Sequence, residues 1–149
     1  MMEITEKIKK ATLEATFDVF EKMFFIFLEP SEDASDDYDM ETCIRFRGGC
    51  LSGSIRMLFT KSLAEGMTRN LLNLDAAPSE QQTADCVKEA VNMVCGNFLS
   101  ILEGKKVFDL SIPEFSGKPL KYIENPGFHK VDLISDEGSL CLVIGISDP

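Results

Sequence analysis

The sequence has few of the residues from which metal, disulfide and nucleophilic sites are usually built. It contains one histidine, His129, and five cysteines, none of them in a C-x-x-C pair. This odd, unpaired set predicts neither a zinc site nor a disulfide framework. Several cysteines lie in apolar stretches, where cysteine packs as a small hydrophobic residue, so we expect reduced, buried thiols. A nucleophilic Cys–His129 pair is an alternative that no local sequence feature supports.

A long hydrophobic run is also missing. The longest apolar stretch, Met23–Leu28, has six residues, whereas a membrane-spanning helix needs roughly 20. The first twelve residues mix acidic with basic side chains and contain no small-residue cleavage site. These features predict a soluble, unprocessed cytoplasmic protein.

Positive charge is scarce relative to negative charge. The chain has 15 Lys and Arg residues against 25 Asp and Glu residues, a net charge of −10. Such a chain repels a phosphate backbone and an anionic lipid surface, so we expect no nucleic-acid partner and no membrane contact. A partner that offers a small cationic feature fits this charge.

The sequence does contain enough apolar material for one core. Its 149 residues are 44% hydrophobic and 27% charged, an ordinary globular composition. A chain of this length buries about 68% of the surface that its unfolded form exposes. We therefore predict a single folded domain over residues 1–149.

Hydrophobic periodicity predicts helices and strands in a mixed order. Apolar residues recur at intervals of three and four over residues 4–28 and 80–102, which indicates two long helices. Ser79 is suited to cap the second of them, and Gly48-Gly49 indicates a two-residue hairpin turn. The other predicted elements are strands at 42–47, 53–59, 107–115, 129–135 and 139–147, a short helix at 61–73 and a turn-rich segment at 117–127.

Seven acidic residues lie between Glu29 and Glu41, a stretch predicted to be a solvated loop. Calcium binding there is disfavoured, because an EF-hand loop starting at Asp33 needs glycine at its sixth position and glutamate at its twelfth. The sequence has Tyr38 and Ile44 at these positions.

The two halves of the chain resemble each other. Residues 11–29 align with residues 86–104, and each long helix is followed by β structure that ends in a hairpin. This suggests an internal duplication of a helix-plus-β-hairpin unit. The predicted fold is α+β, an antiparallel sheet with two long helices packed on it.

The helix at 80–102 has two distinct faces at 100° per residue. Asp85, Glu89, Asn92 and Gly96 fall within roughly 60° of one another, away from the apolar stripe. Such a polar face is commonly just the solvent-exposed side of an amphipathic helix. Asn and Gly are poor helix formers, however, and Gly costs about 1 kcal/mol relative to Ala. Their presence there indicates a partner that approaches closely. The apolar stripe consists of Val87, Val91, Val94, Phe98 and Leu102.

The spacing Asp85-x-x-x-Glu89-x-x-Asn92, followed by Gly96 and then by Pro113, resembles the signature of the CheC/CheX/FliY chemotaxis phosphatases. The interval before Pro113 is slightly shorter than in the usual family form. The segment at 11–24 is also similar to the opening helix of CheX-type members, so the resemblance covers most of the chain.

One departure from that family pattern lies on the first helix. Two-site members repeat Glu-x-x-Asn there, whereas this chain has Glu14 and Phe17. A Phe side chain neither orients water nor hydrogen-bonds a phosphate. The resemblance is therefore to the single-site CheX type.

The resemblance implies a phosphatase that acts on a CheY-like response regulator phosphorylated on aspartate. Asn92 would orient the attacking water, and Glu89 would pair with the regulator's active-site lysine. Asp85 and Gly96 would belong to the partner contact. The Mg²⁺ would belong to the regulator, so we expect no cofactor of the chain's own. The resemblance also implies a homodimer.

Two other functions are alternatives. The domain could be a non-catalytic adaptor or sequestering module that binds a receiver domain, because Glu89 alone would support docking. An enzyme that acts on small molecules is disfavoured, since the sequence has no glycine-rich phosphate loop before a helix, no acid pair and no nucleophile motif.

Overall fold

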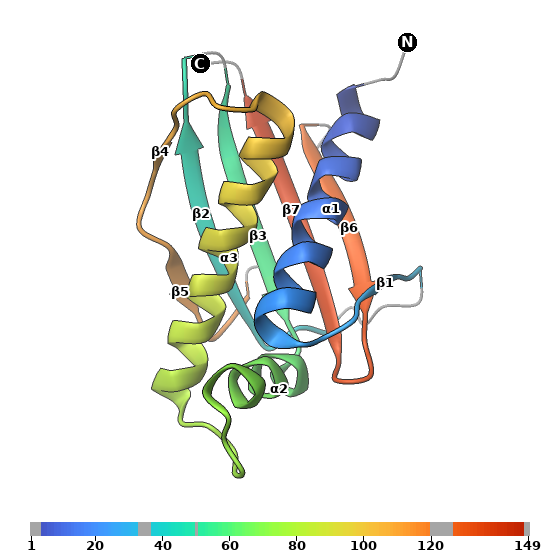
Figure 1. Cartoon of the computed structure of the whole chain (residues 1–149), viewed down its shortest axis with the longest axis vertical. Helices are drawn as coiled ribbons and strands as arrows, with labels where there is room; N and C mark the ends of the chain where they lie inside the picture. The colour runs from blue at the N-terminus through green and yellow to red at the C-terminus, as the bar shows by residue number, and fades with distance from the viewer. Residues whose placement is uncertain (1–3, 33–36, 50, 120–126, 148–149) are drawn as a thin grey trace.

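An antiparallel sheet carries two long helices side by side on one face (Figure 1), which confirms the predicted α+β class. This computed structural model describes residues 4–32, 37–49, 51–119 and 127–147. Its elements are α1 (Ile4–Phe24), β1 (Glu29–Pro30), β2 (Met40–Arg47), β3 (Ser52–Phe59), α2 (Lys61–Leu72), α3 (Glu80–Glu103), β4 (Asp109–Leu110), β5 (Glu114–Ser116), β6 (Phe128–Ile134) and β7 (Ser139–Ser147).

The core lies between the sheet and the helices. Side chains alternate across each strand, so Ile44 of β2 and Met57 of β3 point toward the helices and are fully buried. The predicted apolar stripe of α3 meets them and fixes that helix on the sheet. Its buried members are Val87, Val91, Val94 and Phe98, each 0% exposed.

The strand order places the two hairpins next to each other. It runs β1-β6-β7-β3-β2, with β4 and β5 both paired to β2, and β3 pairs with β7 at the centre. Helix α1 packs over β6, whereas α3 packs over β2. Each long helix thus covers the hairpin of the other half of the chain. The proposed duplication stays a prediction.

The first helix is shorter than its periodicity predicts. It ends at Phe24 instead of residue 28, and residues 25–28 form neither helix nor strand. Phe24, Ile26 and Leu28 are buried while Phe25 and Phe27 are exposed. This six-residue apolar run therefore reads as helix from its composition, but the chain leaves the helix to reach β1 at the sheet edge, where Glu29 pairs with Ile134 of β6.

Three further predictions about local structure are wrong. The first hairpin has a four-residue connection, because Arg47 pairs with Ser52. The strand predicted at 107–115 is two short strands, β4 and β5. Glu41 is not solvated but lies in β2, 6% exposed, with Arg56 Nε 3.6 Å from its carboxylate.

Some predictions fall on undescribed parts of the chain. Most of the turn-rich segment at 117–127, the centre of the acidic loop and Cys50 lie outside the described residues.

Candidate functional site

Helix α3 carries the predicted site and begins with a complete capping box. The hydroxyl of Ser79 accepts a hydrogen bond from the Gln82 backbone N–H at 3.1 Å, and the Gln82 side chain accepts one from the Ser79 N–H at 2.9 Å. These two bonds satisfy backbone donors that have no partner within the helix. The predicted cap at Ser79 is therefore confirmed.

The exposed face of α3 lies where the sequence predicts it. Asp85, Glu89 and Gly96 are exposed, and Asn92 is half-buried, while Val91 beside it is fully buried. The helical phase is thus confirmed, and four of the five predicted site residues share one face.

The side chains of this face differ in how they are held. The carboxylate of Asp85 accepts a hydrogen bond from Gln81 Nε2 at 2.8 Å and lies 3.7 Å from Lys88 Nζ. Among the described residues, by contrast, no hydrogen bond or ion pair involves the Glu89 carboxylate or the Asn92 amide. The Glu89 carboxylate is a hydrogen-bond acceptor, and the Asn92 amide beside it is both a donor and an acceptor. Neither has a partner among the described residues.

Gly96 adds open space to the same face. A Cβ atom built at this position would have no atom within 4 Å outside its own helical neighbourhood. Packing within the described part of the chain therefore does not require a glycine at this position of α3.

Pro113 is not part of this face. It is half-buried in the segment between β4 and β5, which runs along the edge of the sheet beside β2. Ser111 fixes that segment, because its backbone N–H donates to the carbonyl of Arg45 and its hydroxyl accepts from the Arg45 N–H, both at 2.9 Å.

The matching stretch of α1 has a different character. Phe17 is half-buried and packs against the core, and Glu14 is exposed. Glu14 lines a groove of about 330 Å³ between the two long helices, together with Asp18 and Asn97. The amide of Asn97 donates to the Asp18 carboxylate at 3.3 Å. The sequence gives no local signal of this contact, because Asn97 falls outside the motif and its partner lies on another helix.

Three of the four described thiols are poorly suited to nucleophilic catalysis. Cys86, Cys95 and Cys141 are buried and unpaired. Burial raises the pKa of Cys95 and of Cys141 to about 12, and it also raises the pKa of Cys86. These three groups are therefore protonated thiols at neutral pH, as the sequence analysis predicts.

Neither a metal cluster nor a membrane helix is found in the described part of the chain. No group of three or more His, Cys, Asp or Glu side chains there is placed to hold a metal ion. No described helix is both long and apolar enough to cross a membrane.

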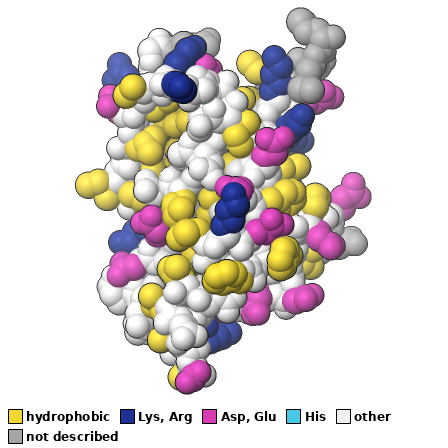
Figure 2. All heavy atoms as spheres, in the orientation of Figure 1, with side chains coloured by type: hydrophobic (Ala, Val, Ile, Leu, Met, Phe, Trp, Pro, Cys, Tyr) yellow, Lys and Arg dark blue, Asp and Glu magenta, His cyan; other side chains and the backbone are white. Residues whose placement is uncertain are grey.

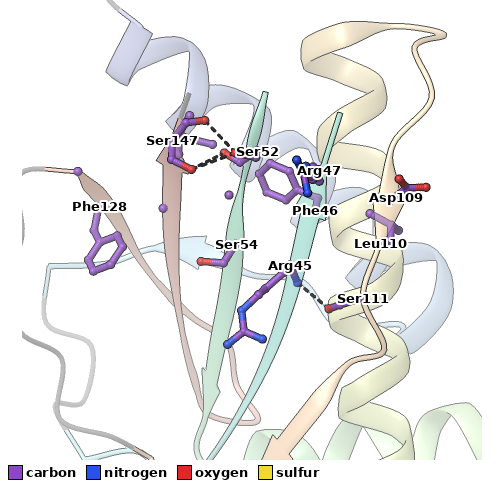
Figure 3. Close-up of a pocket in the computed structure, with 14 residues that line it drawn as sticks. Arg45, Phe46, Arg47, Ser52, Ser54, Asp109, Leu110, Ser111, Phe128 and Ser147 are labelled. Atoms are coloured by element: carbon purple, nitrogen blue, oxygen red, sulfur yellow. Dashed lines mark hydrogen bonds between the residues drawn. The ribbon is translucent and has the colours of Figure 1, made fainter. Parts of the chain in front are cut away.

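A cavity of about 680 Å³ lies on the other face of the sheet, away from the helices. Arg45 and Arg47 of β2 and the hydroxyls of Ser52 and Ser54 line it (Figure 3). Arg45 is paired with Glu114 at 3.0 Å. None of the five predicted site residues lines this cavity, so it is separate from the α3 face.

Comparison with protein families gives one match. The family described as chemotaxis phosphatase CheX matches residues 40–131, more than half of the chain. A comparison with curated protein sequences found no match.

Several solved structures with a similar fold are of chemotaxis proteins. The chain is similar to the chemotaxis protein CheX from Vibrio vulnificus, with 21% identity, a TM-score of 0.81 and coverage of 98% of this chain and 100% of that one. It is similar to CheX from Desulfovibrio desulfuricans, with 21% identity, a TM-score of 0.78 and coverage of 94% and 99%. It is also similar to the CheX–CheY–BeF₃–Mg²⁺ complex from Borrelia burgdorferi, with 21% identity, a TM-score of 0.69 and coverage of 93% and 97%.

Proposed function

Because the chain belongs to the family of the chemotaxis phosphatase CheX, we propose that it dephosphorylates a CheY-like response regulator. The substrate is the aspartyl phosphate of the regulator's receiver domain. The Borrelia burgdorferi relative has been crystallised together with CheY, BeF₃ and Mg²⁺, which supports a partner of this kind for the present chain.

The adjacent pair of exposed Glu89 and half-buried Asn92 carries the proposal. Both side chains project from a rigid, capped helix and have no hydrogen-bond or ion-pair partner within the described chain. Asn92 and Gly96 stand within the length of α3, and both residue types weaken helices. A helix face that contacted only water would not need them. A partner that seats against Gly96 accounts for both.

The reaction requires mainly that water be positioned. Water attacks phosphorus in line with the bond to the aspartate oxygen, that bond breaks, and inorganic phosphate and a free aspartate are formed. Positioning and electrostatics dominate such transfers. The Asn92 carbonyl oxygen accepts a hydrogen bond from the water, and its N–H donates to a phosphoryl oxygen. No covalent intermediate on this chain is involved.

Glu89 serves docking in this mechanism. Its carboxylate pairs with the ammonium group of the regulator's active-site lysine, a contact that strengthens as the interface excludes water. Asp85, held by its neighbours on α3, adds negative charge at the edge of the contact. The Mg²⁺ is bound by the regulator, and this chain supplies no ligand to it.

Two substitutions on α3 separate catalysis from docking. Asn92→Ala is expected to lower kcat about 10²-fold or more with binding largely kept, because it removes a transition-state contact. Glu89→Ala is expected to weaken the complex as well as the rate, and the added loss should shrink at high salt. Ser100→Ala, on an exposed position of the same helix, is the matched control.

The measurement is the phosphate lifetime of a panel of receiver domains, alongside binding to a beryllofluoride-loaded receiver. An Asn92→Ala variant as fast as the parent would refute water positioning. A parent that binds a receiver but never shortens its phosphate lifetime would establish the adaptor function instead.

The family also motivates an assembly. We propose that the chain forms a symmetric homodimer that leaves the Glu89–Asn92 face open. Light scattering at micromolar concentration should give twice the mass of one chain. A monomer, or a dimer in which Asn92 is covered, would contradict this.

A further inference from the structure

Two phenylalanines stand exposed where α1 ends. Phe25 is 68% and Phe27 is 72% exposed, although three neighbours in the same run are buried. Exposed and buried side chains alternate along this segment, with Phe24, Ile26 and Leu28 buried. Two large aromatic side chains exposed to water within three residues of sequence are costly and commonly mark a contact surface. We call them the Phe25–Phe27 pair.

The backbone at Phe25 is also unfavourable for its side chain. Its φ is +55°, in the left-handed region that glycine adopts freely and that bulky residues avoid. The turn is held from both sides. The Ile26 N–H donates to the Phe20 carbonyl at 3.0 Å, and Asn70 Nδ2 of α2 donates to the Phe24 carbonyl at 2.8 Å. An exposed Phe in this conformation gains no core contact that would offset its strain.

The end of α1, which the pair follows directly, lies level with Glu89 and Asn92 along the helices. Helices α1 and α3 run antiparallel and side by side (Figure 1), and the Asn97–Asp18 hydrogen bond fixes their alignment. Eight residues from Asn97 toward the start of α3 lead to Glu89. On α1, six residues from Asp18 lead to its last residue, Phe24, and the same rise from Asn97 leads to Val91, between Glu89 and Asn92.

Acidic side chains surround the pair. Glu21, Glu29 and Glu32 are exposed on the adjoining turn of α1 and on the chain that follows. Figure 2 shows the helix-bearing side of the molecule, where hydrophobic side chains gather over the lower end of α1 among acidic ones. The complementary surface is therefore apolar and bordered by Lys or Arg.

We propose that the Phe25–Phe27 pair is a second contact site for the receiver domain that docks on Glu89 and Asn92. The inference rests on the proposed function. A stable interface buries about 800 Å² on each partner, far more than one ridge of α3 offers, so the contact extends beyond that helix. Aromatic side chains are enriched at such interfaces, and this pair follows the end of α1 that lies level with Glu89 and Asn92 on the neighbouring helix.

The test uses variants that remove the aromatic rings without damaging the core. Phe25→Gly suits the left-handed backbone, and Phe27→Ser replaces an exposed ring. Ile4→Ser is the matched control, because Ile4 is 70% exposed at the opposite end of α1. Each variant is assayed for receiver dephosphorylation, for binding to a beryllofluoride-loaded receiver and for thermal unfolding.

The double variant is expected to raise KM and Kd about tenfold or more, with kcat within about two-fold of the parent, since neither ring touches a reacting atom. Phe25→Gly alone should unfold at the same temperature as the parent or higher. Ile4→Ser should match the parent in affinity.

Two outcomes would overturn the proposal while leaving the phosphatase function intact. One is unchanged KM and Kd in the double variant. The other is a change in molar mass by light scattering without a change in receiver affinity, which would assign the pair to contact with a second copy of this chain. A parent that dephosphorylates no receiver of the panel would instead refute the proposed function and this inference together.

Discussion

Gly96 is the residue at which helix stability and partner docking make opposite demands. Replacement by alanine is expected to stabilise the protein by about 1 kcal/mol, because an added Cβ meets no atom of the chain. The same methyl group stands where the receiver is proposed to seat, so receiver affinity should fall. Urea unfolding and binding to a beryllofluoride-loaded receiver measure the two effects. A Gly96→Ala variant with undiminished affinity would show that no partner approaches this position.

Glu14 tests whether the first helix retains a second site. Because Phe17 occupies the position that would carry the amide and packs against the core, Glu14→Ala should leave phosphatase activity within about two-fold of the parent. Initial rates with a phosphorylated receiver check this. A hundred-fold loss would mean that α1 takes part in catalysis.

At the scale of elements, the start of α3 holds the site in place. Ser79→Ala removes one half of the capping box and should destabilise the protein by about 1 kcal/mol. The control Ser100→Ala should change stability by less than about 0.5 kcal/mol. Urea unfolding measures both. The kcat of Ser79→Ala should equal that of the parent, since Glu89 and Asn92 lie more than two turns further along the helix.

Elements with local signals could be predicted from the sequence. Helix α3 begins after Ser79 and ends before Gly104, and both residues act on the backbone within one turn of their own position. The placement of Glu89 and Asn92 on the face away from the core follows from the phase of one helix. Their roles stay proposals, because a role depends on a partner that the sequence does not contain.

Elements that depend on distant partners could not be predicted in the same way. No glycine marks the end of α1, and Phe25 takes the left-handed conformation because α2 and β6 hold the chain on either side of it. Glu41 is buried because β2 lies within the sheet with Arg56 opposite, a pairing that acidic composition does not reveal. The groove contact between Asn97 and Asp18 likewise requires two helices to be packed first.

For the whole molecule, buried thiols link stability to alkaline pH. The unfolded thiols ionise near pH 9, whereas Cys95 and Cys141 keep their protons in the folded state to a pKa of about 12. Between these values the unfolded state binds fewer protons, so rising pH favours unfolding. Each thiol should lower the free energy of unfolding by up to about 1.4 kcal/mol per pH unit there.

This prediction is measured by urea unfolding with reducing agent at pH 8 and pH 10.5. Cys95→Ala should show a shallower loss of stability between the two conditions than the parent. An identical pH dependence in the two proteins would contradict the assignment.

The central pairing of β3 with β7 has a consequence for how the chain reaches its fold. Ser52 and Ser147, which hydrogen-bond across it, are 95 residues apart in sequence. A loop of that length must close before the pairing contributes stability, and domains dominated by such non-local contacts fold in milliseconds to seconds. Until residues 139–147 pair with β3, one edge of β3 is unpaired. The apolar stripes of α1 and α3 also lack the central strands against which they pack. During that interval a newly made chain is at its greatest risk of aggregation.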